Sequence, residues 1–401
     1  MRLGHAVAAV CLAEVLGMAG YSVFPALIPL FLDEWALSNA EAGWITGIFF
    51  LGYTVVVPFL VGITDRIDPR RVYLASTALA AAAVLGFALL ADGFWTAMLF
   101  RAIAVIGLAG TYMPGLKALT DRAEGASQAR IVTWYTAFFT VGAGLSFVIA
   151  GTVTDWLGWR WAFGAAGLAT LAGLAIAWLA LPAAPPKAAV HGGALLPAFG
   201  PVLRNRVAMA YILGYGALVW TLTALRSWIV AFLVFSQSLQ PTGATLLGAT
   251  AVAAVINMIG VPSGIAGNEL GIRFGLRRVV VLIFLASAAF GAFFGFTASW
   301  PHLAVLGLCV LYFIVIQGNV STLTTGAVAA AEPGRVGATM ALHSFVGFAG
   351  AFAGPLVFGL GLDLTGGNES VLAWGLAIAV GALACTLGAI VVGTMGRPRA
   401  E

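Results

Sequence analysis

The sequence predicts an all-α membrane protein in which twelve transmembrane helices form two pseudo-symmetric six-helix bundles. Three observations carry this prediction. The 401 residues are 61% hydrophobic and 8% charged, with a mean hydropathy of +1.03, whereas soluble domains are about 45–50% apolar and about 25% charged. The apolar runs are about 20 residues long, as helices that cross the bilayer require, rather than the short alternating segments of a β-barrel. The longest connection between these runs divides them six and six.

This composition excludes three classes of protein: a cytosolic enzyme, a disordered chain and a nucleic-acid binder. A soluble globule this apolar would have no polar surface to place in water. The pI near 9.1 does not indicate nucleic acid, because the basic residues are spread along the chain and not clustered. Cys11, Cys309 and Cys385 lie far apart inside apolar runs, so neither a disulfide nor a metal site is predicted. We expect no cofactor.

Twelve apolar runs are long enough to cross about 30 Å of hydrocarbon. The first is too long for a signal peptide, and no small-residue cleavage site follows it. The seventh is long enough to be tilted or broken. The predicted spans are 5–31, 42–63, 72–91, 94–117, 131–154, 160–181, 206–235, 242–266, 279–299, 302–325, 336–362 and 371–395.

The basic residues indicate which way these spans cross the membrane. An even number of spans puts both termini on one side. With the termini inside, all of the 19 Lys and Arg residues except Arg101, Arg160 and Arg226 fall in cytoplasmic segments. This asymmetry follows the positive-inside rule. It predicts a multi-pass protein of the bacterial inner (cell) membrane with both termini in the cytoplasm.

Residues 182–205 are rich in proline and glycine and are predicted to form a cytoplasmic linker. The linker separates an N-terminal bundle, residues 1–181, from a C-terminal bundle, residues 206–401. The loops after spans two and eight, residues 62–71 and 264–278, echo each other, because each places an acidic or amide residue ahead of a basic pair. Two repeated six-helix bundles predict a transporter with its site at their interface.

On these residues the chain resembles the major facilitator superfamily over essentially its whole length. Residues 62–71 resemble that family's signature Gly-x-x-x-Asp-Arg-x-Gly-Arg-Arg, with the first glycine one position late and Asp68-Pro69 in place of a single glycine. Arg101 matches the position of the family's span-four arginine, and the sequence Gly-Trp-Arg-Trp-Ala-Phe at 158–163 opens span six as in the family. The resemblance implies alternating access, with spans one, four, seven and ten around a central cavity.

The resemblance also implies a cytoplasmic latch in the first of these loops. An acid at a helix end can cap a facing helix N-terminus or pair with an arginine. Asp65 would be the latch acid, and Arg66, Arg70 or Arg122 its partner. Alternatively, these charges only keep the loop on the cytoplasmic side of the membrane. The predicted gating residues are Asp65, Arg66, Arg70, Arg71 and Arg122.

Polar side chains inside the spans are the candidates for the site, because a charge at mid-bilayer is costly and usually faces a cavity or a partner. Helical spacing gives each of the four cavity-lining spans a polar face. His343 is assigned to packing. The predicted substrate-binding residues are Tyr21, Arg101, Tyr112, Tyr215, Thr223, Arg226, Gln317 and Ser321.

Glu14 is the only acid within a predicted span, and its depth would allow a pair with Arg101. An apolar cavity disfavours the ionised carboxylate and a nearby arginine favours it, so Glu14 is the predicted proton-coupling residue. The alternative is a permanent structural ion pair. Arg226 can bind an anionic substrate or extend to the outer interface. The charges of Glu14, Arg101 and Arg226 sum to +1, which favours an anionic substrate.

These features predict a secondary active transporter of a small organic solute, anionic and proton-coupled as in a symporter. One alternative is efflux of amphipathic, drug-like compounds by proton antiport, although span five lacks the Gly-x-x-x-Gly-Pro pattern, which occurs at 350–355 instead. Remote alternatives are an intramembrane enzyme, which the scattered histidines disfavour, and a non-transporting sensor. No enzyme activity is predicted. The expected partners are a small-molecule substrate, protons and the lipid bilayer, without nucleic acid, and the chain is expected to be a monomer.

Overall fold

The computed structural model describes residues 3–64, 66–121, 126–181, 183, 199–240 and 248–396, which are helical apart from short turns and loops. Within these ranges, eleven helices are long and apolar enough to cross a membrane, and a shorter apolar helix covers Gly4–Gly20. Large apolar side chains such as Trp156 and Leu179 are exposed to 87% and 82%, as expected for surfaces that face lipid. The predicted all-α membrane fold is confirmed.

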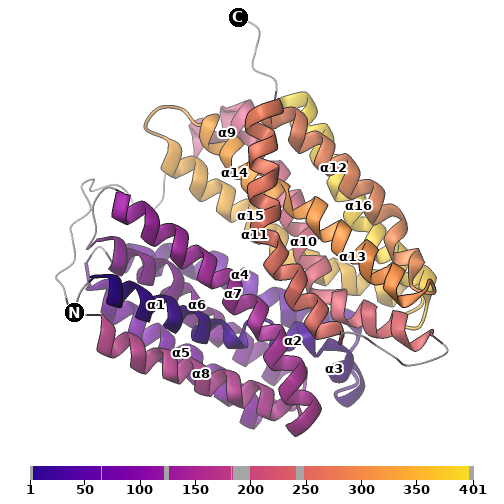
Figure 1. Ribbon diagram of the computed structural model, residues 1–401, viewed down its shortest axis with the longest axis horizontal. Coiled ribbons are helices and arrows are strands. Elements are labelled where there is room, and N and C mark those ends of the chain that lie inside the picture. Colours follow the sequence, from indigo (N-terminus) through magenta and orange to yellow (C-terminus); the bar gives the residue numbers. More distant parts are fainter. Residues whose placement is uncertain are drawn as a thin grey trace, which may run out of the picture. The chain divides into compact units, whose positions relative to one another are not determined.

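Contacts group the chain into two compact units, whose elements are labelled in Figure 1. Unit 1 comprises Met1–Leu30, Ile48–Leu195 and Ala253–Met258, and unit 2 comprises Phe31–Gly47, Leu196–Val252 and Ile259–Glu401. Of the predicted linker, only residues 183 and 199–205 lie in the described ranges. The division of the chain at 182–205 therefore stays a prediction.

Unit 1 is built on α5, which packs against α6 and α8, while α1 packs against α7 and α8 (Figure 1). Small residues allow these close approaches. At Gly107, for example, an added Cβ would lie 2.5 Å from the Cβ of Ala80. The elements are α1 (Leu3–Gly17), η1 (Met18–Gly20), α2 (Val23–Ala26), most of α4 (Asn39–Ile63), α5 (Pro69–Leu90), α6 (Phe94–Thr120), α7 (Ala126–Leu157) and α8 (Trp159–Ala180).

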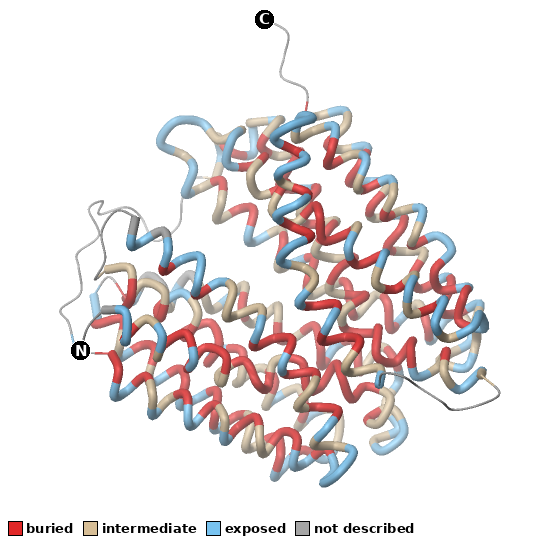
Figure 2. The backbone as a smooth tube through the Cα atoms, viewed as in Figure 1, coloured by how far each residue is buried: buried red, intermediate tan, exposed pale blue. Residues whose placement is uncertain are grey.

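Unit 2 is built around α10 (Arg206–Ser238), which packs against α15 and α16. In the most apolar stretch of α10, 78% of the residues are buried, against 39–56% in the corresponding stretches of the other ten candidate spans. Figure 2 shows the buried residues of each helix in red. Its other elements are α3 (Ile28–Glu34), α9 (Gly200–Arg204), most of α11 (Ala249–Phe274), α12 (Leu276–Phe293), η2 (Phe294–Thr297), α13 (His302–Gln317), α14 (Asn319–Ala329), α15 (Val336–Thr365) and α16 (Val371–Met395).

Several predicted spans differ from the observed helices. The first, 5–31, is broken into α1, η1, α2 and α3, and the tenth, 302–325, divides at Gly318 into α13 and α14. The seventh is the continuous helix α10, so of the two alternatives, a tilted or a broken helix, the break is not found. The predicted loop at 264–278 is wrong, because α11 continues to Phe274. Gly275 alone turns the chain there, at a φ of +93° that favours glycine.

The echo between the two halves of the sequence has a structural counterpart in each unit. In unit 1, Arg70 Nη2 donates to the carbonyl of Trp178, 2.9 Å away in the last turn of α8. In unit 2, Arg277 Nη1 donates to the carbonyl of Gly393, 2.8 Å away in the last turn of α16. The last four carbonyls of a helix have no donor within the helix. Each arginine therefore completes the C-terminus of the last helix in its unit.

The predicted latch is only partly visible in the described ranges. Asp65 and Arg122 lie outside them. Arg66 and Arg71 are exposed, and Arg70 is held by the carbonyl of Trp178. The gating role of these residues stays a prediction.

The N-terminus of α4 is capped by an acid from α15 within unit 2. One oxygen of Asp363, Oδ1, accepts from Asn39 N at 3.1 Å and Asn39 Nδ2 at 2.7 Å, and Oδ2 accepts from Ala40 N at 2.8 Å. The first N–H groups of a helix have no acceptor within it, and a carboxylate also matches the positive end of the helix dipole. Asp363 thereby fixes where α4 begins.

Replacing Asp363 should destabilise this junction. We expect Asp363→Ala to cost about 0.5–1 kcal/mol, the lower part of the range for helix caps, because the carboxylate is exposed. The measurement is the apparent melting temperature in detergent. Glu369→Ala removes an exposed acid from the same region and is the matched control. Equal melting temperatures for the two variants would contradict the capping role.

Candidate functional site

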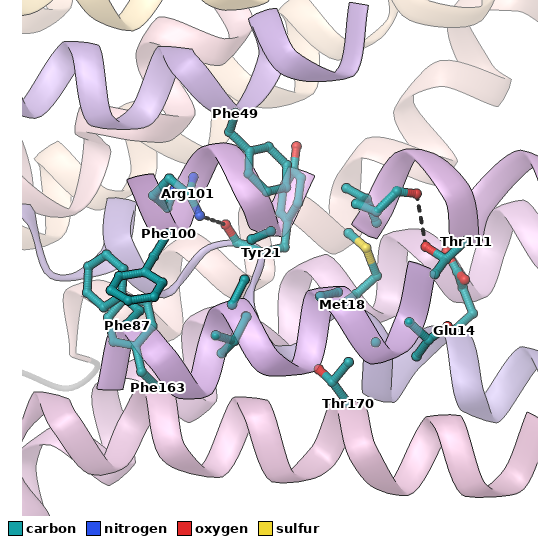
Figure 3. A pocket seen from close by; sticks show the side chains of 18 of the residues that line it. Glu14, Met18, Tyr21, Phe49, Phe87, Phe100, Arg101, Thr111, Phe163 and Thr170 are labelled. Atoms are coloured by element: carbon teal, nitrogen blue, oxygen red, sulfur yellow. Dashed lines mark hydrogen bonds between the residues drawn. The ribbon is translucent and has the colours of Figure 1, made fainter. Parts of the chain in front are cut away.

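Unit 1 contains a pocket between α1, η1, α4, α5, α6 and α8. Figure 3 shows Arg101 near one end of this pocket and Glu14 near the other, with Tyr21 and Met18 between them. The wall is mostly apolar, with a few threonines such as Thr111. Both ionisable groups that the sequence predicted for the N-terminal half therefore line one pocket.

Glu14 is 2% exposed and bonded on one oxygen only. Tyr135 of α7 donates its hydroxyl proton to Glu14 Oε2 at 2.7 Å. The other oxygen, Oε1, is buried and has no hydrogen-bond partner among the residues that the structure describes. An ionised carboxylate is costly to bury unless it is fully paired, and a protonated one costs less but still leaves a polar atom without a partner. Glu14 is therefore the candidate proton site of this pocket.

Tyr135 is a part of the site that the sequence reasoning missed. It is fully buried, and Tyr112 stacks on it with ring centroids 5.7 Å apart. The hydroxyl of Tyr112 lies 3.4 Å from Thr136 Oγ1. Tyr112, which helical spacing placed on the face of Arg101, thus belongs to the surroundings of Glu14. A tyrosine near the start of span five was the available signal, but only the packing of α7 on α1 connects it with Glu14.

Arg101 is 4% exposed and lies where α1 breaks. Its Nη1 donates to the carbonyl of Tyr21 at 3.3 Å, and its guanidinium carbon lies 4.4 Å from the ring centroid of Phe49. Tyr21 is four residues before Pro25, which has no N–H to donate back to it. Arg101 supplies the missing donor, as the apolar interior of a membrane protein requires.

The expected pair between Glu14 and Arg101 is not formed. Glu14 is bonded to Tyr135, and Figure 3 shows the two ionisable side chains apart. The physical reason is the break in the first span, which creates a carbonyl acceptor at Tyr21 and so holds Arg101 at the other end of the pocket. The alternative of a permanent ion pair fails for the same reason.

Ser146 of α7 forms hydrogen bonds with the backbone where the first span breaks. Its hydroxyl donates to the carbonyl of Ala19 at 2.6 Å and accepts from the backbone N–H of Ser22 at 2.9 Å. One side chain therefore satisfies a donor and an acceptor that the interrupted helix leaves inside the unit. Nothing in the local sequence of span five distinguishes Ser146 from a packing residue.

In unit 2 the structure brings together two of the predicted substrate-binding residues. Arg226 Nη2 donates to Gln317 Oε1, and Gln317 is 1% exposed. Gly260 makes room for the pair, since a Cβ there would meet Gln317 Oε1 and lie 3.4 Å from Arg226 Nη2. Ser321, one turn beyond Gln317, faces Gly264, where an added Cβ would lie 3.0 Å from the serine Oγ.

The remaining predicted residues of unit 2 are engaged in packing contacts. Thr223 Oγ1 donates to Val219 O at 2.7 Å and lies 3.4 Å from the carbonyl of Ala351. That carbonyl precedes Pro355 by four residues and so lacks a helical donor. Thr223 therefore lies beside a carbonyl that a proline has left without its N–H, but its one hydroxyl proton goes to Val219 O in the shorter bond.

Tyr215 stacks on His343, with ring centroids 3.9 Å apart and planes at 20°. His343 is 2% exposed, and its Nε2 lies 3.3 Å from Thr324 Oγ1. These contacts agree with the packing role expected for His343. They also place Tyr215 beside α15 and not beside Arg226 and Gln317.

Comparison with known proteins identifies the family. Residues 10–355 match the family model of the Major Facilitator Superfamily. The chain belongs to this family. The family consists of membrane transporters, which are not enzymes, and the eleven long apolar helices of the described residues agree with a multi-pass membrane protein.

Individual relatives are distant. The chain is 25% identical over 244 residues to protein spinster homolog 3 of Danio rerio, an alignment that covers 59% of this chain and 49% of the relative. It is 26% identical over 372 residues to a gentisate transporter of Corynebacterium glutamicum, covering 88% and 80%. The chain spans about half the length of the first of these relatives.

Among solved structures, the fold is similar to a bacterial homologue of the human lysosomal transporter Spinster, crystallised in an inward-facing and occupied conformation. The TM-score is 0.79, with 17% sequence identity, 98% of this chain and 96% of that chain covered. At this identity the likeness shows the fold alone.

The break in the first span provides a test of the site's architecture. Ser146→Ala would leave two buried backbone groups without a partner, so we expect a loss of about 2–4 kcal/mol in stability. The measurement is thermal unfolding in detergent. Ser287→Ala is the matched control, because Ser287 is equally buried but bonds only the carbonyl of Ile283 in its own helix. A loss no greater than that of the control would show that Ser146 does not hold the break.

Proposed function

We propose that this transporter moves a small organic anion together with a proton, by alternating access. Members of the family carry small organic solutes, and the finer assignment rests on one observation. A single pocket holds a buried acid, Glu14, with one unbonded oxygen and a buried arginine, Arg101, at a distance from it. The acid supplies a proton site and the arginine an anion site.

Charge balance couples the two sites. With the pocket empty, an ionised Glu14 and the cationic Arg101 sum to zero. When an anion binds at Arg101, the sum returns to zero only if Glu14 takes up a proton. Because uncompensated charge in an apolar interior is costly, anion and proton favour each other's binding. Linkage requires this coupling to be reciprocal.

A second anion-binding group is proposed in unit 2, where Gln317 orients Arg226. Guanidinium groups bind carboxylates and phosphates through two parallel hydrogen bonds, and a fixed side chain loses less entropy on binding. The similarity to a gentisate transporter supports an anionic substrate, since gentisate is a carboxylate.

We also propose that the protein lies in the bacterial inner membrane with both termini in the cytoplasm. We propose that it is a monomer and that the residues around Asp65 form the cytoplasmic latch.

The test is proton flux in proteoliposomes that contain a pH-sensitive dye. Carboxylates, phosphate esters, amino acids, sugars and lipophilic cations are added one at a time. We expect an organic anion to trigger proton entry, Glu14→Gln to abolish it, and the control Glu369→Gln, on an exposed acid, to leave it unchanged. One-to-one cotransport of a monovalent anion and a proton carries no net charge, so a membrane potential set with valinomycin should not alter the rate.

Two results would contradict the proposal. Proton movement triggered by lipophilic cations alone would favour efflux of amphipathic compounds by antiport. Anion uptake by Glu14→Gln that still follows an imposed proton gradient would remove Glu14 as the proton carrier, whatever the substrate.

A further inference from the structure

We infer that the pocket of unit 1 takes an aromatic monocarboxylate, with the carboxylate on Arg101 and the ring among the phenylalanines beside it. This inference rests on the proposed function, because it needs the anion site at Arg101. It adds the chemical class of the substrate. The argument comes from what surrounds the guanidinium and from the acid at the other end of the pocket.

The end of the pocket near Arg101 is aromatic on several sides. Phe49 from α4 covers a face of the guanidinium at 4.4 Å. Figure 3 shows Phe87, Phe100 and Phe163, from α5, α6 and α8, grouped beside Arg101. Phenylalanine rings favour edge-to-face and offset contacts with another aromatic ring over contacts with an aliphatic group of equal size. Four different helices therefore present the same preference to one small volume.

These rings are held in place by their own packing. Phe87 and Phe163 stack with centroids 4.0 Å apart. The ring of Phe100 lies against Gly86, where an added Cβ would be 2.9 Å from Phe100 Cδ1. Arg101 is fixed by its bond to the carbonyl of Tyr21. A preorganised cation beside preorganised rings loses little entropy when a flat, rigid acid binds.

The far end of the pocket limits the ligand to one negative charge. Glu14 lies there, and a second carboxylate on the ligand would approach it. Because Glu14 takes up only one proton, a second carboxylate would leave an uncompensated negative charge in the apolar pocket. A neutral or hydroxylated ring edge meets no such penalty, since Tyr135 and Thr111 offer polar groups nearby.

The experiment is titration calorimetry of the purified full-length protein with four probes: benzoate, cyclohexanecarboxylate, terephthalate and benzylamine. Cyclohexanecarboxylate matches benzoate in size and charge but has no aromatic ring. We expect benzoate to bind about 2- to 10-fold more tightly than cyclohexanecarboxylate, from the usual strength of aromatic contacts. Terephthalate should bind more weakly than benzoate, and benzylamine should not bind.

Two variants locate the site. Arg101→Gln should weaken benzoate binding by at least about 10-fold, because it removes a charge-assisted hydrogen bond. Phe100→Leu should bring the affinity for benzoate close to that for cyclohexanecarboxylate while leaving the latter unchanged. The matched controls are Arg130→Gln and Phe59→Leu, on exposed residues of the same unit. Thermal unfolding confirms that each variant is folded.

The outcomes separate this inference from the proposed function. Equal affinity for benzoate and cyclohexanecarboxylate, with both lost in Arg101→Gln, would overturn the aromatic class and leave the anion site in place. Benzoate binding that survives Arg101→Gln would overturn the assignment of the carboxylate to Arg101. Binding of benzylamine without any of the three acids would overturn both the inference and the anionic substrate.

Discussion

Backbone groups inside an apolar medium must find a hydrogen-bond partner within the protein, and much of this structure follows from that constraint. Pro25 removes the donor for the carbonyl of Tyr21, and Arg101 replaces it. Pro355 likewise removes the donor for the carbonyl of Ala351, and the hydroxyl of Thr223 lies beside that carbonyl. Residues that a reader of the sequence would assign to substrate thus also hold a broken or kinked helix together.

The two roles are compatible and even linked in the case of Arg101. A buried guanidinium has five N–H groups in a fixed plane, and a bond to one carbonyl orients that plane. The ring of Phe49 orients it further. The break in the first span therefore exposes a carbonyl that helps to fix the orientation of a buried guanidinium in unit 1.

Glu14 illustrates the opposite situation, in which a polar group is left incompletely satisfied. One oxygen accepts a short bond from Tyr135, and the other is buried without a partner in the described part of the chain. Stable interiors avoid such groups because each one costs free energy. At Glu14, a proton, a water molecule or a ligand can complete the hydrogen bonds of the second oxygen.

The sequence alone determined the membrane fold, the approximate position of the spans and the set of polar residues inside them. Composition and the length of apolar runs suffice for these, because a helix in lipid must be apolar over about 20 residues wherever it packs. Only the tertiary structure decided which polar groups meet. Tyr135 reaches Glu14 across 121 positions and Asp363 reaches Asn39 across 324, and helical periodicity carries no information about such distant partners. The break in the first span also redirected Arg101, because the carbonyl that attracts it exists only once Pro25 has interrupted the helix.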